Sequence, residues 1–438
     1  MKKVLIRAKM SPLKAHSPMD VLNHNLIGNN IGNMLFPYSI GRSVMTDDTE
    51  IYTLGIKDNY SEYEIRNINE TYDCLILPFA NAFRSAFINN LHAAAQLVKR
   101  LNIPCIVVGI GAQANLEKQP KNPELEKASK EFVSAVLEKS AKIGLRGEFT
   151  ADFLQKLGFQ AERDFTVIGC PSMYLYGSKL PEMVVKSLSE HSAVSINSKI
   201  QLPQKFHNFM ARSRKALPNY CYVPQVIQEI DMMYRGQELP DNFSKKLPKH
   251  FPVRWDDAIY TRGKACSFID VPSWLEYLRK KDFSFGSRIH GNIAAVLAGT
   301  PCFIVVSDQR VKELVEYHKL PHMFMSELTK KTSIFDLHEQ ADFAGIARGH
   351  QARFAHYLDF LHENGLQTVF DENTSPESTP FDQKVDEVFS DVTQLVPLAS
   401  LDEKMRRKRL GRMNRSSVYY QKVKKFVQHM RGHGVDIE

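Results

Sequence analysis

The stretch Ser284-Phe-Gly-Ser-Arg-Ile-His-Gly-Asn-Ile-Ala-Ala-Val-Leu-Ala-Gly-Thr-Pro301 has the pattern of a strand, a short loop, a small apolar helix and a glycine stop. Its loop holds the candidate ligand-binding residues Ser287, Arg288, His290, Gly291 and Asn292. An anion bound there would meet free backbone N–H groups and the positive end of the helix dipole. Arg288 can grip a carboxylate or phosphate with two hydrogen bonds, and His290 can transfer a proton near neutral pH. The structural alternative is an interdomain salt bridge for Arg288 and a helix-capping role for His290.

Strand-like and helical runs alternate on both sides of this stretch. On the N-terminal side, apolar runs predict buried strands at residues 4–6, 72–77, 105–108, 143–145 and 166–168. Helices are predicted from Asn122 to about Lys139, and over residues 150–157 with Thr150 as the N-cap and Gly158 as the stop. On the C-terminal side, strands are predicted at residues 193–196, 220–223, 283–286 and 302–306. Such alternation predicts an α/β protein with parallel sheets covered by helices.

The break in this alternation divides the chain. We expect an N-terminal Rossmann-like domain over residues 1–180 and a second one over residues 181–345, with the boundary within residues 178–192. Residues 346–438 are expected to form a helix, a linker at 371–380 and a basic helical tail. Two α/β domains in tandem leave a cleft at the carboxyl ends of both sheets, where ligands are expected.

A second arginine is predicted to face this cleft. In the run Lys142-Ile-Gly-Leu-Arg-Gly-Glu-Phe-Thr150, a strand ends at Arg146 immediately before a helix. Arg146 and Arg288 would then approach one ligand from different domains, which suits a ligand with two anionic ends. The alternative is that Arg146 binds loop carbonyls.

Two glycine-rich turns are weaker candidates for ligand contact. Gly109 and Gly111 follow a predicted strand, but the dinucleotide-binding glycine pattern is not completed, so no nicotinamide cofactor is expected. The turn from Asn30 to Asn33 precedes an apolar helix that begins near Met34. It offers amides to a ligand or forms a tight turn, and the sequence leaves both open.

Composition limits the remaining possibilities. The chain has 438 residues, 43% of them hydrophobic, and six scattered cysteines without metal-like spacing. The net charge is +8, of which residues 401–438 carry +7 from 11 Lys/Arg and 4 Asp/Glu. No apolar run reaches bilayer length and the N-terminus lacks a signal-peptide pattern, so a cytoplasmic protein is expected. The basic tail lacks base-stacking aromatic platforms, so no specific nucleic-acid binding is expected.

The segments quoted above resemble the polysaccharide pyruvyl transferase family. The most specific part is the run from Ser287 to Ala295 with Gly299 and Pro301, followed by the segment from Leu145 to Thr150. The glycines at 109 and 111 and the Asn30–Asn33 turn lie where the N-terminal motifs of the family fall. Two departures remove family acids, because Cys170 and Asn33 stand where aspartates are usual, and Pro78-Phe-Ala-Asn81 replaces a glycine-rich loop.

The resemblance implies a glycosyltransferase-B-like pair of Rossmann-like domains with phosphoenolpyruvate in the cleft. Arg288 and Arg146 would hold the donor and His290 would be the acid/base, with Ser287, Gly291, Asn292, Gly109, Gly111, Asn30 and Asn33 as further substrate-binding candidates. The reaction forms a pyruvate ketal on a sugar or lipid-linked oligosaccharide and needs no metal or cofactor. Two alternatives stay open: a nucleotide-sugar glycosyltransferase of the same plan, and a non-catalytic relative in polysaccharide assembly. Residues 401–431 also alternate basic and apolar side chains, which predicts peripheral contact with an anionic membrane or a helix packed on its own domain.

Overall fold

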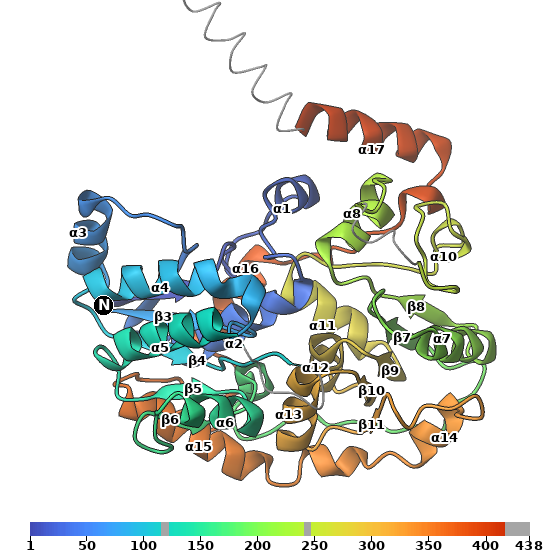
Figure 1. Ribbon diagram of the computed structural model, residues 1–438. Helices are drawn as coiled ribbons and strands as arrows, with labels where there is room; N and C mark the ends of the chain where they lie inside the picture. Colours follow the sequence, from blue (N-terminus) through green and yellow to red (C-terminus); the bar gives the residue numbers. More distant parts are fainter. Residues whose placement is uncertain (115–121, 241–246, 417–438) are drawn as a thin grey trace, which may run out of the picture.

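The computed structural model describes residues 1–114, 122–240 and 247–416. The chain forms two α/β halves that lie side by side (Figure 1). The expected basic tail beyond residue 416 lies outside the described residues.

The N-terminal half is built on a parallel sheet. Its strands run in the order β2-β1-β3-β4, and β5 and β6 continue it through a parallel bridge between Ile110 and Leu145. The strands are β1 (Lys2–Arg7), β2 (Thr49–Leu54), β3 (Cys74–Pro78), β4 (Cys105–Val108), β5 (Ile143–Leu145) and β6 (Phe165–Val167). The helices are α1 (Pro18–His24), η1 (Ile31–Met34), α2 (Leu35–Val44), α3 (Glu62–Thr71), η2 (Ser85–Phe87), α4 (Ile88–Arg100), α5 (Pro123–Leu137) and α6 (Glu148–Lys156).

The C-terminal half repeats this plan with a parallel five-stranded sheet in the order β11-β10-β9-β7-β8. The strands are β7 (Val194–Asn197), β8 (Tyr220–Tyr222), β9 (Phe283–Gly286), β10 (Cys302–Val306) and β11 (His322–Phe324). The helices are η3 (Pro171–Tyr174), which precedes the sheet, α7 (Gln204–Ala216), α8 (Ile227–Arg235), α10 (Ala258–Thr261), α11 (Val271–Arg279), α12 (Ile289–Leu297), α13 (Gln309–Tyr317) and α14 (Ile334–Glu339).

The strand order places a ligand crevice in each half. In both sheets the first strand lies between the second and the third, so the chain changes direction between β1 and β3 and again between β7 and β9. Loops leaving the carboxyl ends of such a strand pair diverge and open a crevice. The expected two Rossmann-like domains in a glycosyltransferase-B-like arrangement are therefore confirmed.

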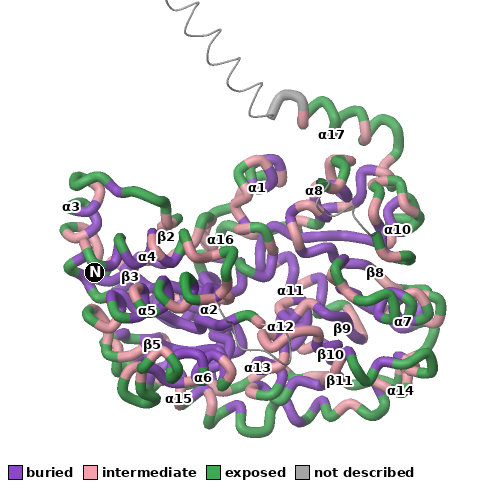
Figure 2. The backbone as a smooth tube through the Cα atoms, viewed as in Figure 1, coloured by how far each residue is buried: buried purple, intermediate pink, exposed green. Residues whose placement is uncertain are grey.

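Burial agrees with sheets covered on both faces. Every residue of β3, β4, β9 and β10 is buried, and Figure 2 shows these strands in the interior of the molecule. Continuous apolar strands of this kind are typical of parallel sheets with helices on both sides. One large core includes residues of both halves, among them Leu35 and Phe36 of α2 and Ile293 of α12, so the halves pack directly on each other.

The segment after residue 345 belongs largely to the N-terminal half. Helix α15 (His350–Glu363) packs Phe354, Tyr357 and Phe360 into a core with Val4 and Ile106 of the first sheet. Helices η4 (Phe343–Ile346), α16 (Pro380–Val388), η5 (Leu398–Ser400) and α17 (Glu403–Ser416) complete the described elements of this region. In Figure 1, α17 lies at the periphery, above α1 and α8.

Two local expectations were wrong. Residues 371–380 are not an unattached linker, because Thr374 O accepts a hydrogen bond from Ser178 N at 2.7 Å and Pro376 O accepts one from Arg42 at 3.2 Å. Thr150 does not cap α6, which begins two residues earlier, after Gly147. Its hydroxyl instead accepts a hydrogen bond from Ala112 N at 2.9 Å, tying the loop after β4 to α6.

Candidate functional site

Arg146 is a buried cation whose guanidinium has no hydrogen-bond partner in the described structure. It follows the last residue of β5, and its side chain is 1% exposed. None of its three guanidinium nitrogens makes a hydrogen bond with any described residue, and Glu313 Oε1 lies 3.9 Å from Nε. Burial lowers the pKa of Arg146 to about 10. Because a buried guanidinium without hydrogen bonds is costly, this geometry is that of a binding site for an anion.

The nearby carboxyl group of Glu313 neutralises Arg146 only in part. Burial raises the pKa of Glu313 to about 7, and the attraction of Arg146 opposes this rise only in part. The Glu313 carboxylate accepts a hydrogen bond from Thr150 Oγ1 at 3.0 Å, which directs it towards the start of α6. Near neutral pH the positive charge of Arg146 is therefore not fully balanced.

Arg310 is the second guanidinium at this centre, and the sequence analysis missed it. It lies in the first turn of α13, just after Asp308, whose carboxylate caps the helix at Val311 N. Arg310 Nε is buried without a hydrogen-bond partner in the described structure, and it lies 3.6 Å from Asp308 Oδ1. The signal was present in the sequence, because Arg310 follows the strand at 302–306 as Arg146 and Arg288 follow theirs.

The charges of Arg146 and Arg310 both act on His290. It occupies the first turn of α12, and its ring meets Phe36 edge-on with centroids 5.1 Å apart. Burial, followed by the charges of Arg146 and Arg310, lowers the pKa of His290 to about 3. Its Nε2 atom is buried and has no hydrogen-bond partner among the described residues. A neutral imidazole, whose Nε2 has no hydrogen-bond partner in the described structure, is therefore subject to the charge of two guanidinium groups.

Lys199 adds a further buried cation near Arg310. Its ammonium donates hydrogen bonds to Asp308 Oδ2 at 2.8 Å and to Ser307 Oγ at 3.0 Å. Burial and the charge of Arg310 lower the pKa of Lys199 to about 8, although Asp308 raises it. Strand-end loops of both sheets thus gather Arg146, His290, Arg310 and Lys199 into one cationic centre.

Arg288 is held more firmly than the sequence suggested. Its Nη2 atom lies 3.2 Å from Glu229 Oε1, and its Nε donates to Ser198 O at 2.9 Å. Glu229 is buried and also accepts a hydrogen bond from Tyr222. The salt bridge that we considered as an alternative therefore exists, but it joins two parts of the C-terminal half rather than the two domains. Only Nη1 of Arg288 has no hydrogen bond in the described structure.

The remaining residues of the Arg288 loop have mainly structural contacts. Asn292 accepts a hydrogen bond from Ser284 Oγ at 3.0 Å and donates one to Arg288 O at 3.0 Å. A Cβ at Gly291 would lie 2.1 Å from Gln225 Nε2, so this glycine permits close packing of the loop. Ser287 is buried, and its hydroxyl has no partner among the described residues, which leaves it available to a ligand.

The two N-terminal glycines act differently. Gly109 has a φ of +72°, and its added Cβ would lie 2.7 Å from Pro171 Cδ, so it fits the chain against η3. A Cβ at Gly111 would lie 2.8 Å from Arg146 Nε. Gly111 therefore leaves the space that the Arg146 guanidinium occupies.

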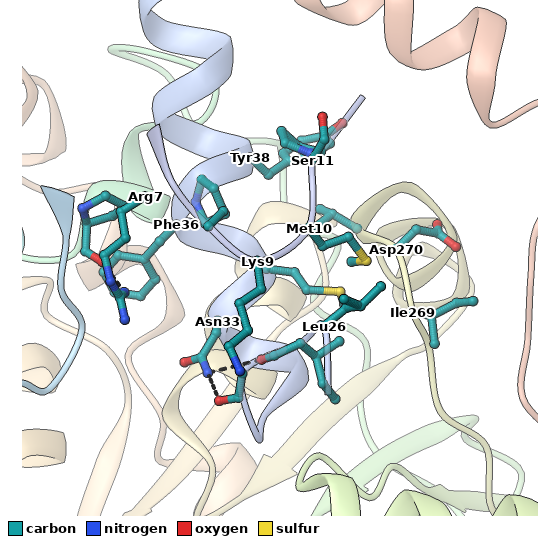
Figure 3. A pocket seen from close by; sticks show the side chains of 18 of the residues that line it. Arg7, Lys9, Met10, Ser11, Leu26, Asn33, Phe36, Tyr38, Ile269 and Asp270 are labelled. Atoms are coloured by element: carbon teal, nitrogen blue, oxygen red, sulfur yellow. Dashed lines mark hydrogen bonds between the residues drawn. The ribbon is translucent and has the colours of Figure 1, made fainter. Parts of the chain in front are cut away.

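The Asn30–Asn33 turn forms η1 and its surroundings. Asn30 caps this short helix by accepting a hydrogen bond from Gly32 N at 2.8 Å. Asn33 Nδ2 donates to Gly28 O at 2.7 Å and to Ile27 O at 3.2 Å (Figure 3). Cys170, at the other departure from the family pattern, is buried, and burial raises the pKa of its thiol. Neither position supplies a negative charge.

A cavity of about 540 Å³ adjoins the cationic centre. Its walls are the segments after β1 and β3, the start of α2, residues 269–271 and residues 388–393. Figure 3 shows Arg7 and Lys9 on one side of this space and Ile269 and Asp270 on the other. Phe36 lines the cavity and also contacts the ring of His290, so the cavity and the cationic centre are neighbours.

The described residues provide neither a metal-binding cluster nor a helix able to span a membrane. Among the described residues, no group of three or more His, Cys, Asp or Glu side chains is arranged to hold a metal ion. Within the same part of the chain, no helix combines the length and apolarity needed to cross a bilayer.

Comparison with known proteins gives one family match. A family model described as polysaccharide pyruvyl transferase matches residues 30–309, which is more than half of the chain. No curated protein matched in a sequence search.

Solved structures show only distant likeness. UDP-GlcNAc 2-epimerase from Methanocaldococcus jannaschii has 11% identity and a TM-score of 0.39, with 82% of this chain and 100% of that chain covered. HepE from Anabaena, in complex with UDP and glucose, has 13% identity and a TM-score of 0.41, with coverage of 83% and 98%. The glycosyltransferase SnogD from Streptomyces nogalater has 10% identity and a TM-score of 0.31, with coverage of 89% and 98%.

Proposed function

Because this chain belongs to the polysaccharide pyruvyl transferase family, we propose that it transfers the pyruvyl group of phosphoenolpyruvate to two hydroxyls of a sugar, forming a ketal on a polysaccharide or its precursor. The observation that carries this proposal is the buried guanidinium of Arg146, which has no hydrogen-bond partner among the described residues and whose charge, with that of Arg310, adds to the effect of burial in lowering the pKa of His290. Phosphoenolpyruvate supplies a carboxylate and a phosphate, and both are anions that guanidinium groups bind in a two-pronged manner.

In this proposal the donor displaces no existing hydrogen bond of the two central arginines. Arg146 and Arg310 hold its two anionic groups, one from each half of the molecule, and Lys199 adds positive charge beside Arg310. Arg288 contributes through Nη1, while Glu229 and Ser198 keep its side chain in place. Fixing both ends of the donor orients the carbon atoms between them for reaction.

His290 is the proposed acid. Without a ligand its pKa is about 3, so the imidazole is neutral at physiological pH. A bound phosphate and carboxylate reverse the local charge, which raises the pKa and lets the ring hold a proton. Transfer of this proton to the methylene carbon makes the methyl group and leaves an oxocarbenium-like centre at C2.

The two sugar hydroxyls then complete the ketal. The oxygen of the first hydroxyl bonds to C2, and its proton restores protonated His290. The bond between C2 and the phosphate oxygen breaks, the second hydroxyl oxygen bonds to C2, and its proton leaves with the phosphate. The reaction releases inorganic phosphate and changes no oxidation state overall, so it requires no redox cofactor.

The alternative function is that of a nucleotide-sugar glycosyltransferase, because a diphosphate would also suit a cationic centre at the start of α12. A thermal-shift titration separates the two donors, since a ligand that binds only the native state raises the melting temperature. We expect phosphoenolpyruvate to stabilise the protein and UDP-glucose to have little effect. The opposite pattern would support glycosyl transfer, and no response to either would favour a non-catalytic relative.

The proposed acceptor is sugar attached to a polysaccharide or to a lipid carrier at the inner membrane face. The described part of the basic tail, α17, has exposed Met405 and Leu410 side chains beside its Lys and Arg residues. Basic helices with exposed apolar side chains bind anionic lipid surfaces. We therefore retain peripheral membrane contact through residues 401–431 as part of the proposal, although residues 417–431 lie outside the described structure.

A further inference from the structure

The cavity beside the cationic centre has positive charges that the donor chemistry does not use. From these we propose that the cavity binds the acceptor, and that this acceptor is an anionic saccharide whose phosphate or carboxylate is held by Lys9 and Lys14. This inference rests on the proposed function, because it assigns the cavity to the second substrate of the same reaction. The cationic side chains of the lining are Arg7, Lys9, Lys14 and Arg84, and its carboxylates are Asp270 and Asp391.

Lys9 and Lys14 are available to a ligand. Both are exposed, and neither makes a hydrogen bond or ion pair with any other residue in the described ranges. Asp270 makes no ion pair with them in the described structure, and its Oδ1 accepts a hydrogen bond from Ser273 N at 2.7 Å that caps α11. Asp391 is a single exposed carboxylate at the opposite end of the sequence. The rim of the cavity therefore keeps an excess of positive charge.

The inner part of the cavity is suited to the sugar. Arg7 is fixed there, because it donates to Pro78 O at 3.1 Å and lies over the Phe79 ring at 4.3 Å. Asn81 Oδ1 is buried and has no hydrogen-bond partner among the described residues, so it can accept a sugar hydroxyl. Aromatic faces and unpaired amides are the usual combination in a site for a polar ring.

The cavity borders the proposed donor site, with Phe36 between them. Phe36 forms part of its wall and contacts His290. Arg84 lines it as well, and the charge of Arg310 contributes to lowering the pKa of Arg84 after the larger effect of burial. In the proposed binding mode, a sugar whose anionic group lies at Lys9 and Lys14 extends inward to the Phe36 side of the cavity, next to His290. The volume of about 540 Å³ is within the range of small-ligand sites.

Calorimetric titration with galactose, galactose 1-phosphate and galacturonate tests this inference. The proteins compared are the full chain, Lys9→Glu/Lys14→Glu, the milder Lys9→Gln/Lys14→Gln, and the control Lys127→Glu/Lys130→Glu on the exposed face of α5. We expect at least one charged sugar to bind the unaltered protein about tenfold or more tightly than galactose. Both Lys9/Lys14 variants should lose that difference, and the α5 control should keep it. Tighter binding of galactose 1-phosphate or of galacturonate shows whether the two lysines hold a phosphate or a carboxylate.

Equal binding of neutral and charged sugars, no binding of any of them, or a charge preference that survives in the Lys9/Lys14 variants would overturn the inference. The stabilisation by phosphoenolpyruvate, measured on the same proteins, should persist in the Lys9/Lys14 variants and also shows that they are folded. The inference is supported if the Lys9/Lys14 variants lose the preference for a charged sugar and still bind phosphoenolpyruvate. Absence of donor binding in the unaltered protein would instead contradict the proposed function, so the two failures are distinguishable.

Discussion

At the scale of single residues, the site is defined by polar groups whose interactions are incomplete. Arg146 is the clearest case, because it is fully buried while its guanidinium makes no hydrogen bond in the described structure. The sequence predicted that Arg146 and Arg288 end strands and face the cleft. It could not reveal that Glu229, which is 59 positions before Arg288, forms an ion pair with it. That partner depends on tertiary packing, which local patterns do not record.

The depressed pKa of His290 predicts a pH effect on stability. In the unfolded chain a histidine binds a proton near its ordinary pKa of 6.5, whereas native His290 does so only near 3. The unfolded state therefore holds more protons between these values, and stability falls as the pH falls from 6.5 to 3. We expect His290→Gln to reduce the slope of unfolding free energy against pH, by up to about 1.4 kcal/mol per pH unit.

Urea denaturation at several pH values between these limits measures that slope. The exposed residue His191 provides the control, since its side chain is 88% exposed and His191→Gln should leave the slope unchanged. An identical slope in His290→Gln and the unaltered protein would show that the imidazole is not held neutral by the buried cationic centre.

Gly111 offers a test of the space around Arg146. In Gly111→Ala, the added Cβ would lie 2.8 Å from Arg146 Nε, so the guanidinium must move. We expect at least about a tenfold weaker affinity for phosphoenolpyruvate in calorimetry, because displaced charged hydrogen bonds are worth more than 1 kcal/mol. Gly411→Ala in α17, where no atom lies within 4 Å of the added Cβ, should bind the donor normally. Normal binding by Gly111→Ala would mean that the donor lies elsewhere.

At the scale of elements, the alternation of apolar runs predicted most strands but not how the helices attach. The run at residues 105–108 coincides with β4, because its four apolar residues are all buried. The start of α6 was misplaced because Thr150, the third residue of the helix, resembles a cap in sequence. Its actual hydrogen-bond partner, Ala112 N, is far away in the chain and could not be inferred. The polar composition of 371–380 suggested a linker, whereas long-range hydrogen bonds to Ser178 and Arg42 fix it.

An ion pair links α16 to α2, beside the contact between the Phe381 and Tyr38 rings. Arg42 is 1% exposed, and its Nη2 lies 2.9 Å from Asp382 Oδ2, while the same carboxylate completes the capping box of α16 with Thr379. Asp382→Ala leaves a buried guanidinium without its carboxylate. We expect a loss of about 3 kcal/mol in the free energy of unfolding, measured by urea denaturation. Asp386→Ala, on the exposed face of the same helix, should cost far less, and equal losses would argue against a specific role of the pair.

At the scale of the whole molecule, two similar α/β halves place strand-end loops from both sheets at one centre. The repeated strand pattern was enough to predict this architecture, since each sheet needs helices on both faces. The cavity was not predictable, because its walls combine the segment after β1 with residues 269–271 and 388–393. Segments so far apart in sequence come together only through the packing of the two halves and the returning C-terminal chain.

The basic tail is expected to bind anionic membranes, and this binding can be tested separately from catalysis. A variant lacking residues 401–438 loses +7 of the net charge of +8. We expect it to lose binding to vesicles that contain anionic phosphatidylglycerol, because basic residues near such surfaces each contribute about 1 kcal/mol. Vesicles of neutral phosphatidylcholine provide the control in a sedimentation assay. Unchanged binding of the truncated protein to anionic vesicles would remove the membrane proposal.

We propose that phosphoenolpyruvate is held between Arg146 and Arg310. The decisive experiment is a calorimetric titration of the protein with this donor. The comparison is between the unaltered protein, Arg146→Ala, Arg310→Ala and the control Arg163→Ala, whose side chain is 63% exposed. We expect the unaltered protein and Arg163→Ala to bind phosphoenolpyruvate clearly. Arg146→Ala and Arg310→Ala should each bind it at least about tenfold more weakly. Undiminished binding by both cleft variants, or no binding by the unaltered protein, would contradict it.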